Sequence, residues 1–419
     1  MSGSPPAATM PALQFDFHLG KLALAKLRGL RRPGGYWKPG GPVALRQVPR
    51  PTLPAEDWVI VQTAYCGICG SDMKELTLSG ARDNPLQTLI SFPQIMGHEA
   101  VGTIEQAGGR VTRLRPGDRV ALSPWLACAP RGIQPACPRC QEGDYTHCHN
   151  FRRGQLPPGM HLGVTPGFGG FAPYVAAHES QCFVIPPEVS FEAAVLADPF
   201  SVAFHSCRLL EPEPDTLVLV YGLGVIGLAT IICLKNLFEV KRVLAVGRYP
   251  FQKELARRLG AERVFLTSGA RLVEEVAAFT GAELYTPDRG WKWCMDGVDA
   301  VLDTISSAAT LEAGLRFLKA QGRLVFTGVE VPRRCENTPH YFKELEIIGS
   351  NAFALETFRG RKAHAFEFFL KFLAEKKFDP SPLVTHQFPL AQYQAAFDTL
   401  AGKSGSHAVK VVFDFTRSS

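Results

Sequence analysis

Residues 215–238 have the sequence DTLVLVYGLGVIGLATIICLKNLF, and they contain the strongest fold signal in the chain. The first part, DTLVLVY, is a short run rich in branched apolar residues, which is typical of a buried strand. The part that begins at Val225 is long enough and apolar enough for a buried helix. Between them lies Gly222-Leu223-Gly224-Val225-Ile226-Gly227. A lone G-x-G-x-x-G is weak evidence, but between a strand and a helix it predicts a phosphate-binding turn.

Each residue of this turn has an expected task. Gly222 permits the tight turn, Gly224 lets the backbone approach a pyrophosphate, and Gly227 lets the helix pack closely on the strand. Val225 and Ile226 begin the helix, whose N-terminus offers free N–H groups and a positive dipole end to phosphates. A glycine-bearing packing turn without a ligand is the alternative.

The chain after this turn alternates between strand and helix patterns. Strands are expected at 215–222, 241–247, 263–267, 298–305, 322–329 and 345–350, and helices at 225–238, 251–259, 271–279 and 308–320. Such alternation predicts βαβ units and an α/β, doubly wound parallel sheet of the Rossmann type. The stretch 282–297, with Trp291 and Trp293, breaks the alternation and is expected to be a surface insertion.

The rest of the chain has a different texture. From residue 43 to residue 204, short strand patterns are separated by Gly/Pro turns, which indicates a β-rich domain. A helix near 363–376 and a strand at 407–415 are expected to return to it. We therefore expect residues 1–204 and 351–419 to form one domain and 205–350 to form the Rossmann domain. The first ten residues are expected to be a flexible tail.

Residues 22–30, LALAKLRGL, precede Arg31 and Arg32 and suggest a short basic amphipathic helix. Two interpretations remain open, contact with a membrane surface and a packing insertion with a solvated polar face. The second is favoured, and membrane contact is not expected, because one short helix binds lipid weakly.

The end of the second Rossmann strand bears on the choice of cofactor. NAD-binding domains usually place Asp or Glu there to bind the ribose hydroxyls. Here the strand runs into Gly247-Arg248-Tyr249, without an acidic residue. Because Arg248 suits a 2′-phosphate, NADP(H) is favoured over NAD(H). The alternative is that Arg248 is a solvated surface residue and that NAD binds through other groups.

Four cysteines cluster between residues 125 and 150, namely Cys128, Cys137, Cys140 and Cys148. A C-x-x-C pair with two further cysteines can complete a closed tetrahedral site, which is typical of structural zinc. His149 is an alternative ligand. The chain has eleven cysteines and no recognisable export signal at its start, so thiols and metal ligands are favoured over disulfides, in a cytoplasmic protein.

Composition excludes some classes of function. The net charge of +6 is modest for 419 residues and suggests no nucleic-acid partner. Hydrophobic residues make up 46%, which fits a packed core. The longest apolar run, 217–232, contains glycines and fits a strand plus a helix better than a membrane span.

Three further segments have residues of the types that bind metals. They are Cys66-Gly-Ile-Cys69-Gly-Ser71-Asp72, Met96-Gly97-His98-Glu99-Ala100 and Ala197-Asp198-Pro199-Phe200. A cysteine and a histidine about thirty residues apart could share a zinc ion, but this spacing alone proves nothing.

Taken together, the motifs resemble the zinc-containing alcohol dehydrogenases of the medium-chain dehydrogenase/reductase family. The pieces GICGSD, GHEAVGTIEQAG, RPGDRV, the cysteine-rich lobe and YGLGVIG follow in the family's order over residues 43–350. The polyol and threonine dehydrogenase branch is similar in one more respect, an acidic residue followed by proline before the Rossmann unit. The resemblance implies that the β-rich domain is a GroES-like catalytic domain.

The resemblance also implies roles for single residues. Cys69, His98 and Asp198 would bind a catalytic zinc, with Glu99 beside the metal and also a ligand in some states. Ser71 would take the proton of the substrate hydroxyl. The four clustered cysteines would hold a second, structural zinc. The implied activity is hydride transfer between a nicotinamide cofactor and an alcohol, aldehyde or ketone, in a homodimer or homotetramer.

The sequence departs from the family pattern at several positions. Asp198 stands where the branch usually has glutamate, and Lys74 stands where a histidine often relays the proton. The loop APRGIQPA separates Cys128 from Cys137 more widely than usual. Asp198 and Lys74 leave open a rival function, a zinc-bearing alkene reductase on the same fold. The basic N-terminal segment and the insertion with Trp291 and Trp293 leave open a second, a non-catalytic nucleotide-binding or membrane-associated protein.

Overall fold

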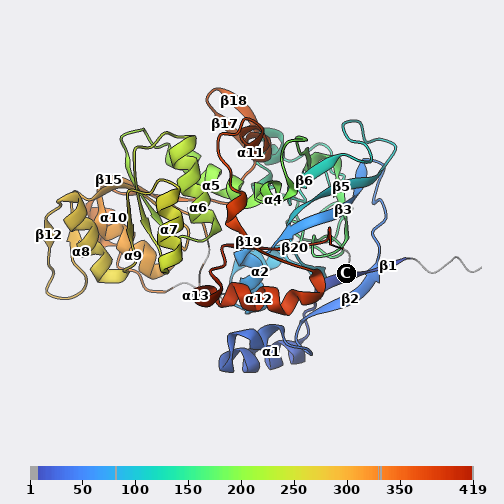
Figure 1. Ribbon diagram of the computed structural model, residues 1–419, viewed down its shortest axis with the longest axis horizontal. Helices are drawn as coiled ribbons and strands as arrows, with labels where there is room; N and C mark the ends of the chain where they lie inside the picture. The colour runs from blue at the N-terminus through green and yellow to red at the C-terminus, as the bar shows by residue number, and fades with distance from the viewer. Residues whose placement is uncertain (1–7, 81–82, 329, 331–332, 418–419) are drawn as a thin grey trace, which may run out of the picture. The chain divides into compact units, whose positions relative to one another are not determined.

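The computed structural model describes residues 8–80, 83–328, 330 and 333–417 (Figure 1). The chain divides into two compact units, which we call unit 1 (Met1–Asp198 and Phe366–Ser419) and unit 2 (Pro199–Ala365). Residues 351–365 belong to unit 2. There the buried carboxylate of Glu356 pairs with His205 and Arg208, which hold this segment to the rest of the unit.

Unit 2 is built on a parallel sheet with the strand order β11-β10-β9-β14-β15-β16. This is the order 3-2-1-4-5-6 of a doubly wound dinucleotide-binding domain, so the expected fold is confirmed. The central strands are buried on both faces, as their unbroken apolar sequences require. The bounds are β9 (Leu217–Tyr221), β10 (Arg242–Val246), β11 (Arg263–Phe265), β14 (Val298–Asp303), β15 (Leu318–Phe326) and β16 (Glu346–Gly349).

The helices of unit 2 follow the expected pattern with one difference. They are α5 (Ala197–Leu210, whose first two residues belong to unit 1), α6 (Val225–Asn236), α7 (Pro250–Arg258), α8 (Gly269–Thr280), α9 (Ala308–Phe317) and α10 (Thr338–Phe342). The prediction of a helix over 308–320 is wrong at its end. Leu318 pairs with Val298 in the parallel sheet, so the chain passes from helix to strand directly after Phe317.

Two hairpins complete unit 2. The insertion at 282–297 forms β12 (Leu284–Tyr285) and β13 (Trp293–Cys294), and the Cys294 side chain is fully buried in the core of the unit. The second hairpin consists of β17 (Leu355–Phe358) and β18 (Arg361–His364).

Unit 1 contains a mixed sheet with the order β19-β20-β3-β5-β6-β8, in which β7 also pairs with β3. Its register places Gly67 of β3 opposite Glu99 of β5 on one side and Val412 of β20 on the other. Residues from distant parts of the sequence therefore meet at this end of β3. The bounds are β3 (Trp58–Gly67), β5 (Glu99–Ala107), β6 (Arg119–Leu122), β7 (Tyr174–His178), β8 (Cys182–Val184), β19 (Val384–Phe388) and β20 (Lys410–Asp414).

A second sheet corrects the expectation of a ten-residue tail. Residues 1–7 lie outside the described residues, but β1 (Thr9–Phe15) pairs antiparallel with all of β2 (Val43–Pro49) and also with β4 (Gln94–Ile95). Met10, Ala12 and Leu13 are buried in this strand, and that burial stabilises it despite Pro11. Residues 9 and 10 therefore belong to a sheet and not to a tail.

The helices of unit 1 are α1 (Leu19–Arg31), α2 (Gly70–Leu76), α3 (Pro138–Glu142), α4 (Phe191–Ala194), α12 (Tyr393–Ala401) and α13 (Lys403–Ser406). The remaining helix α11 (Ala365–Ala374) begins at the boundary of the two units. Short 3-10 helices are η1 (Pro33–Trp37), η2 (Pro85–Leu89), η3 (Tyr145–His147), η4 (Glu179–Gln181), η5 (Ser381–Leu383) and η6 (Leu390–Gln392).

Helix α1 was expected to turn a polar face to solvent, and its solvent side differs in part from this expectation. Its packed side consists of Leu22, which lies against the core of unit 1, the buried Ala25, and Gly29, where a Cβ would lie 2.1 Å from the Tyr36 ring. Leu19 and Leu30 point to solvent together with Lys26 and Arg31, so the solvated side of the helix is apolar as well as polar. Among the described residues, no helix is long and apolar enough to cross a membrane.

Candidate functional site

The glycine turn lies between β9 and α6, as its motif predicts. Gly222 has a φ of +99°, a conformation that side chains other than glycine rarely adopt. A Cβ on Gly227 would lie 1.7 Å from the carbonyl oxygen of Gly222, so only glycine permits this approach of helix to strand. Around Gly224 there is open space, because a Cβ there meets nothing within 4 Å. Val225 and Ile226 form the first turn of α6. The turn thus offers N–H groups next to space for a phosphate.

Thr304 braces the same turn from the end of β14. Its hydroxyl donates to the carbonyl oxygens of Tyr221 (3.1 Å) and Gly222 (3.2 Å). The neighbouring Asp303 is fully buried, and its carboxylate accepts N–H groups of Ile305 and Ser306, both at 2.9 Å. Asp303 therefore stabilises the loop after β14.

Strand β10 is followed by Gly247, Arg248 and Tyr249, the residues that bear on the choice between NAD(H) and NADP(H). Arg248 is exposed, and its guanidinium lies 5.7 Å from the centre of the Tyr249 ring. The Gln252 side-chain oxygen accepts the backbone N–H groups of Arg248 (2.9 Å) and Tyr249 (3.1 Å). A Cβ on Gly247 would lie 2.8 Å from Leu223, which keeps the strand end close to the glycine turn.

In unit 1, Cys69, His98 and Glu99 come together. Their potential ligand atoms all lie within 4.8 Å of one another. Cys69 caps α2, His98 precedes β5, and Glu99 is the first residue of that strand. Gly97, with a φ of +88°, makes the bend that sets His98 in place, and a Cβ there would lie 2.3 Å from Phe171. The structure therefore brings together one sulfur, one nitrogen and one carboxylate donor.

Asp72 supports this group electrostatically. Its carboxylate accepts the Cys69 N–H (2.7 Å), and its other oxygen lies 3.6 Å from Nδ1 of His98. Burial alone would lower the pKa of His98, but Asp72 and Cys69 hold that pKa well above its ordinary value. Burial raises the pKa of Asp72, and His98 opposes this rise. The group thus generates a negative potential that favours a bound cation.

Asp198 lies close to the group but outside its tightest part. It is buried in the first turn of α5. It is not one of the three residues, Cys69, His98 and Glu99, whose potential ligand atoms lie within 4.8 Å of one another. Burial raises its pKa to about 7, and the charge of His98 counteracts that rise. Ser71 is exposed on α2, two residues after Cys69.

Two residues near this group were missed by sequence reasoning. Lys410 in β20 forms a fully buried ion pair with Glu99 and donates to the carbonyl oxygen of Ile68 at 3.1 Å. One feature of the sequence indicates this residue: Lys410 is the single charged residue in the otherwise apolar strand pattern AVKVVF. Lysine is rarely buried without a partner, so a partner is expected there. The His161 ring lies 5.1 Å from the His98 ring, and burial lowers its pKa to about 3. No local pattern in the sequence marks His161.

The four cysteines of the lobe form a second group. The sulfur atoms of Cys128, Cys137, Cys140 and Cys148 lie within 4.8 Å of one another. Backbone N–H groups point at them, from His149 to Cys137 (3.5 Å) and from Asn150 to Cys148 (3.3 Å). Burial opposes ionisation of Cys137, but the backbone N–H groups of His149 and Cys140 and the neighbouring thiols of Cys140 and Cys128 lower its pKa to about 6. A thiolate is therefore favoured at Cys137, whereas burial raises the pKa of Cys128.

Arg131, from the loop that separates Cys128 and Cys137, is fully buried within the lobe. Its guanidinium is surrounded by carbonyl oxygens, and burial lowers its pKa although Cys148 and Cys128 oppose this effect. The carbonyl oxygens belong to Leu126 (2.8 Å), Arg153 (3.0 Å), Leu156 (3.3 Å), Pro157 (3.1 Å) and Gly159.

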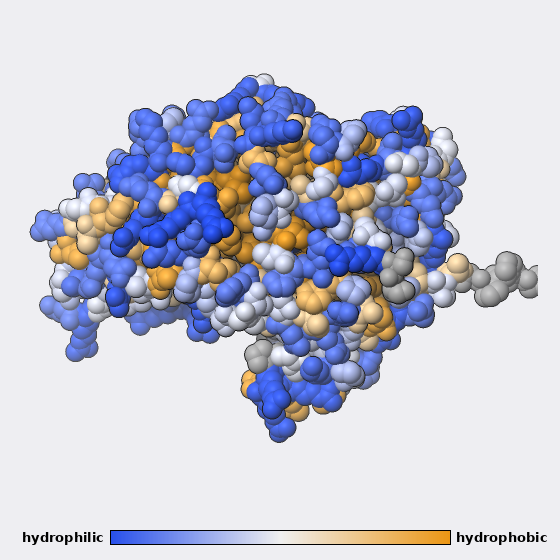
Figure 2. Space-filling view, in the orientation of Figure 1, coloured by the Kyte–Doolittle hydropathy of each residue, from blue (hydrophilic) through white to orange (hydrophobic). Residues whose placement is uncertain are grey.

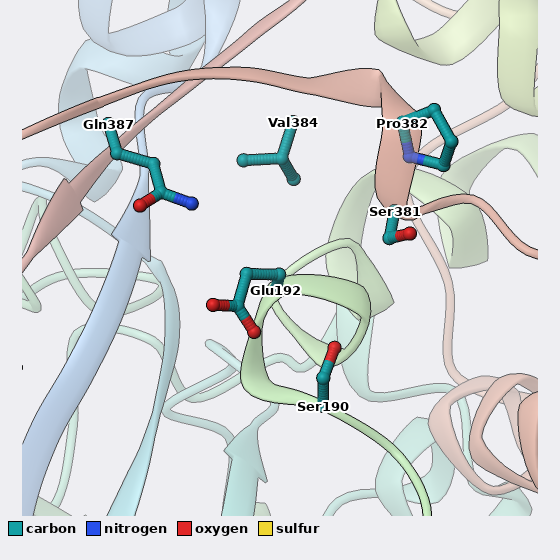
Figure 3. A pocket seen from close by; sticks show the side chains of 6 residues that line it. All are labelled: Ser190, Glu192, Ser381, Pro382, Val384 and Gln387. Atoms are coloured by element: carbon teal, nitrogen blue, oxygen red, sulfur yellow. The ribbon is translucent and has the colours of Figure 1, made fainter.

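A pocket of about 390 Å³ lies elsewhere in unit 1, between α4 and the start of β19 (Figure 3). The carboxylate of Glu192 points into this space and accepts a hydrogen bond from the Tyr65 hydroxyl at 3.0 Å. The residues that line it include none of the predicted site residues.

Comparisons with known proteins agree with the geometry. An alcohol dehydrogenase GroES-like domain matches residues 55–187, and a zinc-binding dehydrogenase domain matches residues 225–370. Sorbitol dehydrogenase of Arabidopsis thaliana is 31% identical over 363 residues, which cover 85% of this chain and 88% of that protein. L-Idonate 5-dehydrogenase of Vitis vinifera is 30% identical over 361 residues, which cover 85% and 87%.

Solved structures show the same fold. An alcohol dehydrogenase of Escherichia coli CFT073, in complex with NADH, superposes with a TM-score of 0.74 at 24% identity and covers 98% of this chain and 100% of that one. The 2R,3R-butanediol dehydrogenase of Bacillus subtilis gives 0.71 at 23% identity, with 97% and 99% covered. The chain therefore belongs to the zinc-dependent medium-chain dehydrogenase/reductase family, in its polyol dehydrogenase-like branch, and is an oxidoreductase of the alcohol dehydrogenase class.

Proposed function

We propose that the protein transfers hydride between NADP(H) and an alcohol, in the reverse direction an aldehyde or ketone, at a zinc centre held by Cys69, His98 and Glu99 or Asp198. The main support for this zinc centre is that sulfur, nitrogen and carboxylate donors lie within 4.8 Å of one another in unit 1. Hydride transfer also needs a nucleotide site, and the glycine turn of unit 2 supplies its phosphate-binding part.

The donor set suits zinc. Thiolate, imidazole and carboxylate are the ligands this ion takes, and a catalytic site usually uses three protein ligands and leaves one position open. The potential that raises the pKa of His98 would equally attract a divalent cation in place of the proton. When bound, zinc supplies Lewis-acid polarisation of an alcohol or carbonyl oxygen.

The surrounding residues have separable tasks. Asp72, bonded to the Cys69 N–H and close to His98, orients both ligands. Lys410 holds the Glu99 carboxylate by the buried ion pair and so limits how Glu99 reaches a metal. Ser71, exposed at the start of α2, takes the substrate proton and passes it to solvent.

The preference for NADP(H) rests on the end of β10. The exposed Arg248 provides a cation for a 2′-phosphate, and no carboxylate follows the strand to repel it. Replacing Arg248 with serine should lower kcat/KM with NADPH at least about tenfold and leave kcat/KM with NADH unchanged. The control is Arg258→Ser, an exposed arginine on α7 paired with Glu254. Equal losses with both nucleotides would contradict the preference.

The four cysteines of the lobe are proposed to hold a second, structural zinc, because four thiols leave no open position. Oligomer formation is also proposed. Strand β16 is at an edge of the parallel sheet, and open strand edges are suited to pairing with a second copy.

Metal content and activity of Cys69→Ala test the central proposal. We expect two zinc ions per chain in the wild type, one in Cys69→Ala, and no alcohol or carbonyl turnover in the variant. Cys335→Ala, which changes a cysteine of unit 2 outside both clusters, should keep both metals and full activity. Equal zinc and equal activity in Cys69→Ala and the wild type would remove the catalytic role of this group and favour alkene reduction.

A further inference from the structure

The outer side of α1 is an unusual feature of unit 1. Leu19, Leu27 and Leu30 are 76%, 64% and 75% exposed. With about 100° of rotation per residue, these leucines fall within one arc of about 80°, so they form a continuous apolar stripe. Soluble surface helices normally turn the opposite, polar side to water. The stripe is therefore a candidate contact surface.

The inner side of α1 explains why the leucines face outward. The helix packs through Leu22, Ala25 and Gly29, and at Gly29 the Tyr36 ring of η1 fills the space that a larger side chain would need. Rotating the leucines inward would drive them into that ring. The exposure is thus fixed by close packing on the other side of the helix.

Cations border the stripe on both sides. By the same helical rotation, Lys26 lies next to one edge of the arc and Arg31 next to the other, and both side chains are exposed. The helix sequence LGKLALAKLRGLR contains no acidic residue. Lys21 lies further round and pairs with Asp16 at 3.6 Å.

A basic basin adjoins the helix. It has a volume of about 610 Å³ and is lined by Arg28, Arg31, Arg32 and Lys38. Asp398 also lines it, and its Oδ1 accepts the indole N–H of Trp37 at 2.9 Å. Four cations thus face a space large enough for a phosphate group. Figure 2 shows apolar and hydrophilic residues side by side on this part of the surface, at the bottom of the view.

We propose that α1 and the basic basin dock the protein on a bilayer containing anionic lipid. The leucine stripe enters the boundary between headgroups and acyl chains, and the arginines bind lipid phosphates. An apolar stripe flanked by Lys and Arg is the arrangement that suits such an interface. A second copy is a poorer occupant, because pairing two stripes about a twofold axis would bring their flanking cations together. The segment 19–38 also lies outside both family-domain matches, at 55–187 and 225–370.

Flotation of the full-length protein with vesicles tests this proposal. One set of vesicles is phosphatidylcholine alone, and the other contains equal parts of phosphatidylcholine and phosphatidylglycerol. We expect reversible binding to the second set only, weakened by added salt. Each basic residue near an anionic surface changes partitioning roughly fivefold, so Arg31→Glu with Arg32→Glu should reduce binding at least about tenfold. Leu27→Glu with Leu30→Glu should abolish it.

These changes affect exposed side chains, so folding and dehydrogenase activity should stay unchanged and the test is independent of the proposed catalytic site. Tyr341→Glu, at an 84% exposed residue of unit 2, is the control and should bind like the wild type. Equal flotation of the leucine variant and the wild type would overturn the proposal. No flotation of the wild type would also overturn it, and a change in oligomer size with the leucine variant would assign the stripe to a second copy.

Discussion

Replacing Arg131 with methionine removes a buried charge from the cysteine lobe while keeping a long side chain. The guanidinium donates five hydrogen bonds to backbone carbonyl oxygens of residues 126–159. Because this stretch includes all four clustered cysteines, Arg131 holds the loop in the shape that brings the sulfur atoms together.

The magnitude follows from these bonds. A hydrogen bond from a charged donor contributes about 1.5–3 kcal/mol, so five would sum to about 7–15 kcal/mol. That sum is an upper bound, because burying the guanidinium has its own cost and water would reach some of the freed carbonyl groups. Single substitutions seldom cost more than about 5 kcal/mol, and we expect about 3–5 kcal/mol here. Since folding of a small metal lobe and metal binding share one free energy, the zinc dissociation constant should rise roughly 10²- to 4 × 10³-fold.

The assay is competition with a chromogenic chelator, which reports zinc release from each site over time. Arg131→Met should release the lobe zinc first. Arg139→Met is the matched control, because Arg139 is an exposed arginine of the same lobe paired with Glu142 at 2.9 Å. If Arg131→Met retained its zinc as long as Arg139→Met and the wild type, the buried arginine would not hold the lobe together.

Three further predictions concern the buried ion pair, the glycine turn and the pH dependence of stability. Lys410→Met leaves the Glu99 carboxylate buried without its cation, so urea unfolding should show a loss of about 3–5 kcal/mol. Gly227→Ala places a Cβ 1.7 Å from the Gly222 carbonyl oxygen, so α6 must shift, and calorimetric titration should show at least about tenfold weaker NADPH binding. Burial lowers the pKa of His364 to about 3, so below the unfolded pKa of about 6.5 the unfolded state binds more protons than the folded state. From pH 7.5 to pH 5.5, urea unfolding of the wild type should therefore show about 1.4 kcal/mol more loss of stability than that of His364→Leu.

Each of these predictions has a contradicting outcome. Lys319→Met breaks a partly exposed ion pair with Asp299 and should lower the free energy of unfolding by less than about 1 kcal/mol. An equal loss in Lys410→Met and Lys319→Met would show that burial does not make the Lys410–Glu99 pair more important for stability. Unchanged NADPH affinity in Gly227→Ala would show that the turn tolerates a Cβ. Equal pH slopes of the wild type and His364→Leu would mean that His364 does not titrate differently on folding.

Much of unit 2 could be predicted because its signals are local. Each buried parallel strand has its own apolar run, and the glycine positions follow from backbone sterics within a single turn. The cysteines of the lobe are equally local, since four thiols in one loop are already near one another before folding. The end of α9 was misjudged, because the pairing of Leu318 with Val298 depends on a strand that helical periodicity does not include.

Local pattern is enough where the residues concerned are neighbours in the chain, as in the glycine turn, the C-x-x-C pair and the order of strands and helices. The three-dimensional fold alone placed Lys410 against Glu99, set His161 beside His98, and kept Asp198 out of the tightest donor group. It also turned Leu19, Leu27 and Leu30 of α1 to solvent. The physical reason is the same in each case. Strand register, burial and close packing between distant segments fix these contacts, and periodicity along the chain reports only which side of an element is apolar and not what that side meets.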